Sequence, residues 1–328
     1  MIETELSRCV ARWFVGATEV AKTTKLSGGA SQETWSFDIV HPDGPTGAIL
    51  RRAPKGYGAA PTRAAGLDAE ARLMQLSHEA GLPSPEVMHV LTPEDDLGTG
   101  FIMRRIEGET IARKILRDEQ FASARPRLAR QLGKVAAGIH ALKREDLPKL
   151  REMTAAKEIA ELMREYRGFD WPRPVFELAL RWLAAHDPGP PEQVTLVHGD
   201  FRHGNLIIGP DGLRAVLDWE LAHLGDPMED LGWVCVNSWR FGEIDNPVGG
   251  FGSREELFAG YAEAGRMVDP ERAKFWEVMG TLRWGVMCCG MMQRFRKGPE
   301  HSMERAMIGR RASETEIDLL RLLVPRGV

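Results

Sequence analysis

The sequence predicts an α+β protein with two parts, a small N-terminal β-sheet lobe and a larger, mainly helical C-terminal lobe. Residues 33–40 alternate polar and apolar side chains, as a half-buried strand does. From about residue 110 the apolar residues recur mostly at helical spacing, and a short strand-like island at 194–219 interrupts them. We therefore expect the N-terminal lobe to span residues 1–105 and the C-terminal lobe residues 106–328.

The N-terminal lobe is expected to hold several strands and one helix. The helix, residues 67–80, has apolar residues at helical spacing, ends at Gly81, and cannot resume because Pro83 and Pro85 follow. A second glycine- and alanine-rich segment, residues 54–61, predicts a loop. The expected strands are residues 33–40, 48–51, 87–91 and 101–103.

The C-terminal lobe is expected to consist of helices with one β-hairpin among them. Prolines in the segment 187–191 end the first run of helices. The turn at residues 209–212 joins two apolar stretches, which predicts a hairpin. Helical spacing then resumes and continues to Leu323. The helices expected before the hairpin are residues 121–142, 155–165 and 174–186.

The composition argues against several classes of protein. A net charge of −4 and a pI near 6.2 provide no basic field for nucleic acid or an anionic membrane. No uncharged apolar run approaches the length of a membrane span, and the first residues lack the regions of a signal peptide. The cysteines at positions 9, 235, 288 and 289 fit neither a zinc site nor a disulfide framework. We therefore expect buried thiols in a reducing, cytoplasmic compartment.

The strand-like island carries the most informative pattern. His198, Asp200 and Asn205 have the H-x-D-x-x-x-x-N spacing of a kinase catalytic loop. Asp218 follows the predicted hairpin, so the returning strand brings it to the same open end as Asn205. The spacing, the hairpin and Asp218 occur together, which favours phosphoryl transfer over ordinary turn chemistry.

Phosphoryl transfer requires positioning and charge neutralisation more than covalent chemistry. Asp200 can accept the proton of an acceptor hydroxyl and orient that hydroxyl as the nucleophile. Asn205 offers a neutral carbonyl oxygen and Asp218 an anionic oxygen, and Mg²⁺ prefers such ligands. We therefore predict that Asp200 is the catalytic base and that Asn205 and Asp218 bind Mg²⁺.

Two other interpretations use the same stretch. His198 and His203 could form a metal-hydrolase site with Asp200 and Asp218. A histidine at the start of a catalytic loop is, however, more often a hydrogen-bonded scaffold residue. In the second interpretation the His-Gly-Asp triplet and the nearby asparagine are only turn and capping residues.

At these residues the sequence resembles the aminoglycoside phosphotransferase (APH) superfamily, also called the choline-kinase-like or phosphotransferase enzyme family. The match consists of His-Gly-Asp-x-x-x-x-Asn at 198–205 followed by Asp-Trp-Glu at 218–220, and the resemblance extends over nearly the whole chain. It implies a protein-kinase-like bilobal fold, ATP in the cleft between the lobes, Mg²⁺, and phosphorylation of a small-molecule hydroxyl. It also implies the catalytic and metal-binding roles given above.

The resemblance further implies a set of nucleotide-binding residues. Arg51 stands where better-known members of the family carry lysine, and it is expected to meet the α- and β-phosphates and to pair with Glu70. Its neighbour Arg52 could take the same role. The remaining nucleotide-binding residues implied in this way are Ser27, Gly28 and Gly29 in the nucleotide loop and Met103, Arg104 and Arg105 in the interlobe hinge.

The acceptor is less determined. C-terminal stretches at 281–286, 308–311 and 318–323 resemble a branch that includes the kinase-like domains of acyl-CoA dehydrogenase fusion proteins. For that branch the resemblance implies hydroxyacids or hydroxyacyl-CoA esters as acceptors. The near balance of acidic and basic residues after residue 107 also disfavours a polycationic aminoglycoside.

Alternatives remain open for the acceptor and for the activity itself. A basic cluster formed by Arg283, Arg294, Arg296 and Lys297 could meet an anionic acceptor, although a solvated helix face is the simpler interpretation. A phosphotransferase acting on aminoglycosides or other antibiotics is one alternative. A catalytically weak pseudokinase, suggested by Arg51, is another. The sequence does not decide between ATP and GTP, or between a monomer and a homodimer.

Overall fold

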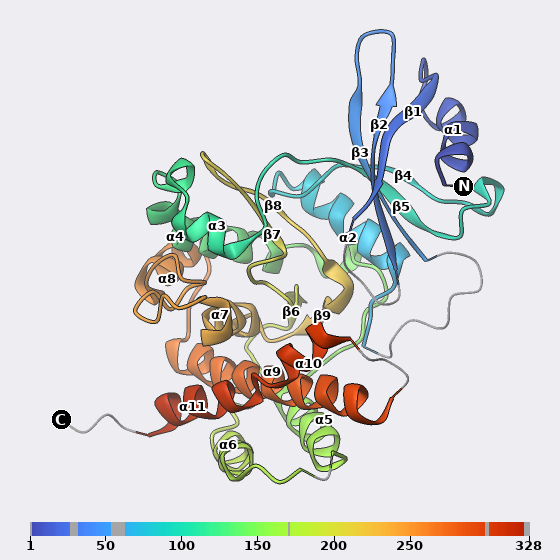
Figure 1. Ribbon diagram of the computed structural model, residues 1–328. Helices are drawn as coiled ribbons and strands as arrows, with labels where there is room; N and C mark the ends of the chain where they lie inside the picture. Colours follow the sequence, from blue (N-terminus) through green and yellow to red (C-terminus); the bar gives the residue numbers. More distant parts are fainter. Residues whose placement is uncertain (1, 27–31, 54–62, 170, 299–301, 325–328) are drawn as a thin grey trace.

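The computed structural model describes residues 2–26, 32–53, 63–169, 171–298 and 302–324 (Figure 1). An antiparallel sheet with the strand order β1-β2-β3-β5-β4 forms the N-terminal part. The sequence predicts four of its strands but not β1. The expected loop at 54–61 lies outside the described residues. The strands are β1 (Glu19–Lys25), β2 (Glu33–Val40), β3 (Thr46–Ala53), β4 (Val87–Val90) and β5 (Thr99–Arg104).

Two helices, rather than the single predicted one, accompany this sheet. The expected helix is α2 (Leu67–Glu79), and the sequence-based prediction missed α1 (Ile2–Trp13), which packs on β1. Leu6 and Val10 of α1 belong to a separate apolar cluster with Leu50 of β3. The signal for α1 was its apolar residues at helical spacing between acidic and basic ones.

The sheet is therefore covered on both faces, and this decides where β3 side chains point. Successive residues of a strand face opposite sides of the sheet. Leu50 packs in the cluster beneath α1, whereas Ile49 packs in the main core with Met74 of α2. Arg51 and Arg52, which continue this alternation, must also face opposite sides.

Helices dominate the rest of the chain, with two short two-stranded sheets among them (Figure 1). Strands β6 (Thr195–Val197) and β9 (His223–Gly225) pair, and so do β7 (Leu206–Gly209) and β8 (Gly212–Val216). The helices are α3 (Ala112–Arg117), α4 (Arg125–His140), α5 (Ala155–Arg167), α6 (Pro174–Ala185), α7 (Met228–Cys235), α8 (Arg254–Glu263), α9 (Pro270–Lys297), α10 (Met303–Gly309) and α11 (Ala312–Leu323). Short 3₁₀ turns are η1 (Pro93–Asp95), η2 (Glu119–Phe121), η3 (Arg144–Asp146), η4 (Trp219–Leu221) and η5 (Asn237–Trp239).

The long helix α9 is the centre of the helical part. It contacts α5, α6, α7, α10 and α11, and most residues from Ala273 to Gly290 are buried. Such all-round burial is typical of a core helix. Within the described residues, no helix is both long and apolar enough to span a membrane. The four cysteines are buried free thiols, as expected from their spacing, and burial raises the pKa of Cys235 and of Cys288 to about 12.

Candidate active site

The hairpin of β7 and β8 brings the predicted metal ligands together. Leu206 pairs with Val216, and the N–H of Leu217 donates to the carbonyl of Asn205 at 2.8 Å. Asn205 and Asp218 therefore lie at the same open end of the hairpin, as the sequence predicts. Asp218 has a left-handed backbone with φ of 65°, a conformation that costs a non-glycine residue free energy and often marks a functional position.

Asp200 lies directly against Asn205. The side-chain amide of Asn205 donates to Oδ2 of Asp200 at 2.7 Å and to its carbonyl at 3.0 Å. The other carboxylate oxygen, Oδ1, accepts from Nε of Arg202 at 2.8 Å and from Nε1 of Trp233 at 2.9 Å. Arg202 and Trp233 were missed in the sequence, where only the spacing of the motif carried a signal. These donors fix the orientation of the carboxylate.

His198 acts as a scaffold of the loop rather than as a metal ligand. Its Nδ1 accepts from the N–H of Asp200 at 3.2 Å, and its Nε2 donates to the carbonyl of Leu217 at 3.1 Å. Burial lowers the pKa of His198, which favours this neutral form. Burial also lowers the pKa of His203 to about 4, and Nε2 of His203 donates to the carbonyl of Gly249.

These contacts remove the support for a metal hydrolase. Both ring nitrogens of His198 are occupied by main-chain groups. In the described part of the chain, no group of three or more His, Cys, Asp or Glu side chains could hold a metal ion. A magnesium site differs because it uses the amide oxygen of Asn205 and keeps several waters.

A buried carboxylate holds the catalytic loop from behind. Oδ1 of Asp230 accepts from the N–H of Gly199 at 3.0 Å, and Oδ2 accepts from the N–H of His198 at 2.8 Å and from Nε2 of His140 at 3.0 Å. Gly199 has a φ of 80°, and a Cβ there would lie 2.5 Å from the carbonyl oxygen of Leu221. Only glycine fits this turn. The sequence could not reveal the role of Asp230, because its partners come from two segments that lie far from it in the chain.

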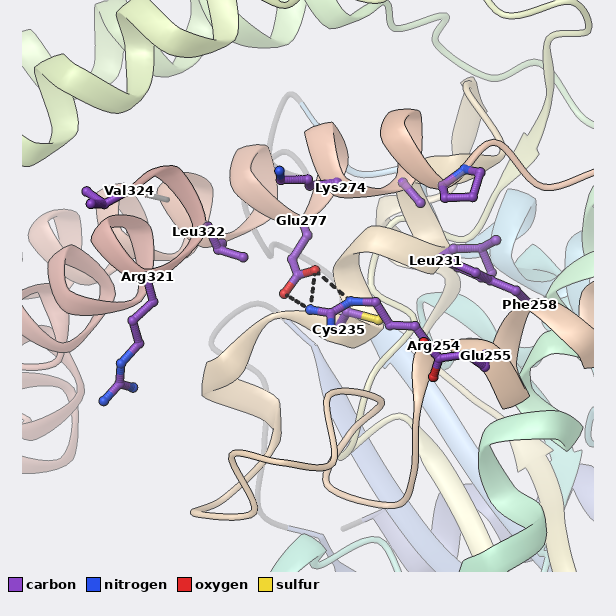
Figure 2. Close-up of a pocket in the computed structure, with 12 residues that line it drawn as sticks. Leu231, Cys235, Arg254, Glu255, Phe258, Lys274, Glu277, Arg321, Leu322 and Val324 are labelled. Carbon is purple, nitrogen blue, oxygen red and sulfur yellow. Dashed lines mark hydrogen bonds and ion pairs between the residues drawn. The ribbon is translucent and has the colours of Figure 1, made fainter. Parts of the chain in front are cut away.

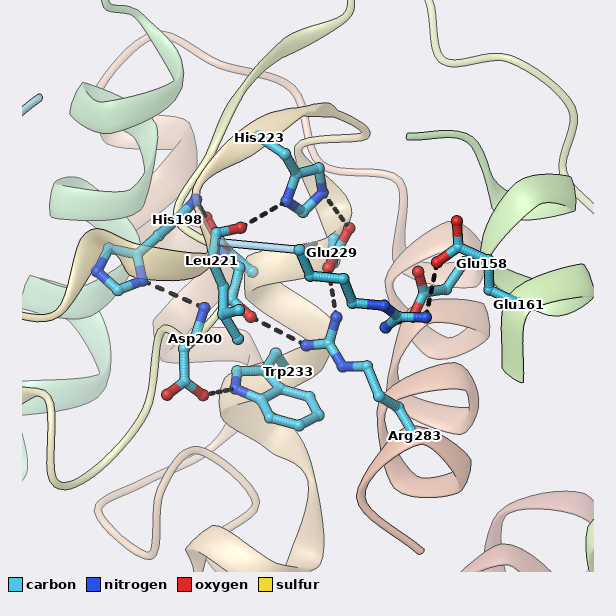
Figure 3. A network of polar contacts seen from close by, with 12 residues as sticks. Glu158, Glu161, His198, Asp200, Leu221, His223, Glu229, Trp233 and Arg283 are labelled. Carbon is cyan, nitrogen blue, oxygen red and sulfur yellow. Dashed lines mark hydrogen bonds and ion pairs between the residues drawn. The ribbon is translucent and has the colours of Figure 1, made fainter. Parts of the chain in front are cut away.

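A second buried network adjoins the same loop (Figure 3). Nη1 of Arg283 donates to Oε1 of Glu229 at 2.8 Å, and Nη2 donates to the carbonyl of Gly199 at 3.0 Å. His223 contacts the other oxygen of Glu229 at 3.0 Å. Although burial opposes it, the charges of His223 and Arg283 lower the pKa of Glu229 to about 2. The guanidinium of Arg283 also lies 4.0 Å from the ring centre of Trp233.

This network corrects the expectation of a basic cluster on α9. Arg283 is only 8% exposed and supports the catalytic loop, so it faces neither solvent nor an acceptor together with Arg294, Arg296 and Lys297.

The predicted ion pair between Arg51 and Glu70 is present. Nε of Arg51 lies 3.1 Å from Glu70, and Nη2 lies 2.6 Å from Oδ1 of Asp218 and 3.6 Å from Glu220. Burial raises the pKa of Glu70 to about 7, against the opposing charge of Arg51. Arg51 thus connects the sheet, α2 and the proposed metal-binding end of the hairpin.

Arg52 does not lie with Arg51. Its guanidinium faces the other side of the sheet, where it lies 3.0 Å from Glu33 and 3.6 Å from Glu5 and donates to the carbonyl of Leu97. Between the two candidates left open by the sequence, only Arg51 contacts Glu70 and Asp218.

The other predicted nucleotide-binding residues are less informative. Ser27, Gly28 and Gly29 lie outside the described residues. Met103 is buried in the sheet, while Arg104 pairs with Glu86 and Arg105 with Asp38. The N–H groups of Arg104 and Arg105 donate to the carbonyls of Glu86 and Gly47, so these N–H groups are already used. Binding of adenine at this hinge stays a prediction.

A cavity of about 630 Å³ lies away from this centre, among α7, α8, α9 and α11 (Figure 2). Leu231 and Cys235, one helical turn apart on α7, line the cavity. Trp233, which contacts Asp200, lies on the opposite side of the same helix. In the cavity wall, Glu277 accepts from Arg254 and Arg240. The cavity therefore does not provide the catalytic cleft.

A model of the phosphotransferase enzyme family matches residues 22–276. The chain belongs to this family. Members of the phosphotransferase enzyme family are small-molecule kinases, which agrees with the activity predicted from the catalytic-loop spacing.

Sequence relatives of this family member include much longer proteins. The chain is 29% identical over 195 residues to acyl-CoA dehydrogenase family member 10 of Mus musculus, and this match covers 57% of the chain and 18% of the relative. It is 26% identical over 244 residues to acyl-CoA dehydrogenase family member 11 of Gallus gallus, covering 71% of this chain and 30% of the relative. The chain thus spans less than a third of the length of either relative.

Solved structures show the same fold. A Ralstonia eutropha protein described as an aminoglycoside phosphotransferase superposes with a TM-score of 0.73 at 20% identity, covering 97% of each chain. Macrolide 2'-phosphotransferase of Brachybacterium faecium gives 0.61 at 18% identity, covering 98% of this chain and 99% of the other. A mutant aminoglycoside phosphotransferase in complex with AMP-PNP and hygromycin B gives 0.64 at 18% identity, covering 98% and 100%. The predicted kinase-like fold is confirmed.

Proposed function

We propose that this protein transfers the γ-phosphoryl group of ATP, with Mg²⁺, to a hydroxyl group of a small molecule, with a hydroxyacid or hydroxyacyl-CoA ester as the acceptor. The observation that carries the proposal is the contact of Asp200 with Asn205 at the open end of the hairpin, beside Asp218. Membership of the phosphotransferase enzyme family supports the reaction type.

Asp200 would act as the base in this reaction. Its Oδ1 accepts hydrogen bonds from Arg202 and Trp233, which orient the carboxylate. Its Oδ2, shared with the amide of Asn205, can accept the proton of an incoming hydroxyl. A fixed carboxylate of this kind lowers the barrier by orienting the nucleophile before transfer.

Asn205 and Asp218 suit a magnesium ion. The amide nitrogen of Asn205 is engaged by Asp200, which turns its oxygen away from that contact. None of the described residues donates a hydrogen bond to this oxygen or to Oδ2 of Asp218. When bound, Mg²⁺ would neutralise the charge of the β- and γ-phosphates. Asp218 keeps a side-chain exposure of 26%, so its carboxylate is accessible from the cleft.

Arg51 would bind the phosphates of the nucleotide. Its guanidinium is permanently charged and can contact phosphate oxygens bidentately. Glu70 holds the Nε side of the group, while Nη2 contacts Asp218. A phosphate near Asp218 can therefore accept a hydrogen bond from Nη2 of Arg51 while Nε keeps its contact with Glu70.

The acceptor class rests on weaker support than the reaction. The relatives named as acyl-CoA dehydrogenase family members favour an acyl-derived acceptor. The likeness to a structure that contains hygromycin B favours an antibiotic acceptor, but it reaches only 18% identity. We also keep the lobe boundary at residues 105/106 and the cytoplasmic compartment as proposals, the latter supported by four free cysteines.

An acceptor screen with ATP consumption as the readout tests the proposal. The panel compares 3-hydroxybutyrate, 3-hydroxybutyryl-CoA, choline, homoserine, a macrolide and kanamycin. We expect turnover with a hydroxyacid or its CoA ester, dependence on Mg²⁺, and a loss of roughly 100- to 10,000-fold in Asp200→Asn. Efficient turnover of kanamycin alone would reject the acceptor class, and ATP turnover that is unaffected in Asp200→Asn would reject the reaction.

A further inference from the structure

One arginine of the described chain, Arg151, lies near the charged groups of Glu158, Glu229 and Arg283. Nε of Arg151 is buried, and no acceptor in the described part of the chain receives a hydrogen bond from this guanidinium. A buried N–H group that has no acceptor costs free energy. By contrast, Arg51, Arg202 and Arg283, which surround the catalytic centre, all have carboxylate partners.

The backbone holds Arg151 in place. Leu224 of β9 donates to the carbonyl of Arg151 at 2.9 Å, and Met153 donates to the carbonyl of Leu224 at 2.9 Å. This bridge attaches the segment of Arg151 to the strand that contains His223, a member of the network behind the catalytic loop (Figure 3). Burial lowers the pKa of Arg151. The carboxylates of Glu158 and Glu229 oppose this shift, whereas the positive charges of Arg63 and Arg283 add to it. An anion would relieve both effects.

Arg151 lines a cavity of about 500 Å³ together with Arg63, Met153, Glu161, Arg164 and Glu165. Arg63 is already paired, at 3.3 Å with Glu158 and at 2.7 Å with Glu161. Two residues after Arg63, the N–H of Ala65 donates to the carbonyl of Glu220 at 2.7 Å. The wall of the cavity is thus joined to the segment that contains Asp218.

We propose that Arg151 is the anchor of a subsite that binds an anionic group of the phosphoryl acceptor, a carboxylate or a phosphate, in the cavity between α5 and the segment of residues 151–153. The proposal rests on the proposed phosphotransferase function. The nearby carboxylates already have other partners. Glu158 and Glu161 pair with Arg63, and Glu229 pairs with His223 and Arg283. None of the described residues accepts a hydrogen bond from Nε of Arg151. A neutral acceptor would leave the guanidinium unpaired, so this subsite selects for a negative charge.

The test follows the Nε–Hε NMR resonance of Arg151, assigned by its disappearance in Arg151→Gln. The probes are 3-hydroxybutyrate and butane-1,3-diol, which has the same carbon skeleton without the carboxylate, added at tens of millimolar and constant ionic strength. We expect a saturable shift with 3-hydroxybutyrate and none with the diol. We also expect Arg151→Gln to weaken 3-hydroxybutyrate binding, measured by calorimetry, at least tenfold, and Arg151→Lys to weaken it less. Equal shifts with both probes, or none with either, would overturn the proposal.

Two controls distinguish the subsite from a structural role of Arg151 and from the proposed phosphotransferase function. Arg181→Gln on the exposed face of α6 should change neither binding nor the unfolding midpoint, whereas Arg151→Gln should bind less without a lower midpoint. A lower midpoint in Arg151→Gln would indicate a structural role and overturn the subsite. In Asp200→Asn the Arg151 shift should persist while phosphoryl transfer is lost. If transfer is independent of Asp200 and the shift remains, the proposed function fails and only an anion site stands.

Discussion

The two sides of the catalytic loop differ in how their charged groups are satisfied. On the cleft side, Asp218 has 26% of its side chain exposed and Arg51 has 17%. On the protein side, Asp230 and His140 are fully buried and Arg283 has 9% exposed, each with close partners. On the protein side, the charged groups are paired with one another. On the cleft side, Oδ2 of Asp218 and the amide oxygen of Asn205 accept no hydrogen bond from the described residues.

This difference separates the residues that stabilise the catalytic loop from those that are available to a ligand. A buried charge that loses its partner is costly, so the groups behind the loop fix its geometry and contribute to the free energy of unfolding. Under the proposed function, the groups that face the cleft would gain their remaining partners from the nucleotide and Mg²⁺. The distinction would be wrong if a substitution on the cleft side unfolded the protein, or if a substitution behind the loop left the free energy of unfolding unchanged.

The largest effect is expected behind the loop. Arg283→Met leaves Oε1 of Glu229 and the carbonyl of Gly199 without a donor, and we expect a loss of about 3–5 kcal/mol in the free energy of unfolding. Urea denaturation measures this loss. The matched control is Arg181→Gln, on the exposed face of α6, which should change stability by less than about 0.5 kcal/mol. Equal stability of Arg283→Met and wild type would show that the buried network is not structural.

Adjacent arginines on β3 sharpen the comparison within one strand. Arg51→Gln removes the contacts with Glu70 and Asp218, and we expect the KM for ATP to rise roughly 10- to 100-fold. Arg52→Gln, on the other face, should leave the KM unchanged and reduce stability by no more than about 1 kcal/mol. Steady-state kinetics on both variants measure this. A larger KM change in Arg52→Gln would reverse the assignment.

The smallest expected effect is a pH dependence at Glu70. Its pKa is about 7 in the folded protein and near 4.5 when exposed, so the folded protein keeps a proton that the unfolded chain has released. The contribution of Glu70 to the free energy of unfolding therefore falls as pH rises from about 4.5 to 7. Ionised Glu70 holds Arg51 more firmly, so the KM for ATP should fall severalfold as pH rises through 7. Profiles of wild type and Glu70→Gln measure this, and the step should be absent from the variant.

Much of the site was accessible from local sequence. The spacing from His198 to Asn205 and the turn before Asp218 are short-range features, and the hairpin register follows from two apolar strands around a four-residue turn. The helix containing Glu70 was equally visible in its periodicity. By contrast, α1 was missed because a short amphipathic segment at the start of the chain was not read as part of the sheet lobe.

Other parts depended on which distant segments pack together. Asp230, Glu229 and Arg283 are ordinary charged residues in the sequence, and helix packing alone brings them to Gly199. The expected basic cluster on α9 failed for the same reason, since burial of α9 turned Arg283 inward. Similarly, no sequence pattern distinguishes the unpaired Arg151 from its many paired neighbours.

By itself, the sequence determined the α+β class, the catalytic-loop spacing and the return of Asp218 to Asn205, because these depend on residues close together in the chain. The tertiary structure decided that Arg51 rather than Arg52 reaches Asp218 and that Arg283 supports the loop. It also left Nε of Arg151 buried without a hydrogen-bond partner among the described residues. The physical reason is that the partners of a buried charge are chosen by packing between elements far apart in sequence. Local periodicity specifies which face of an element is apolar, but not which charges will meet there.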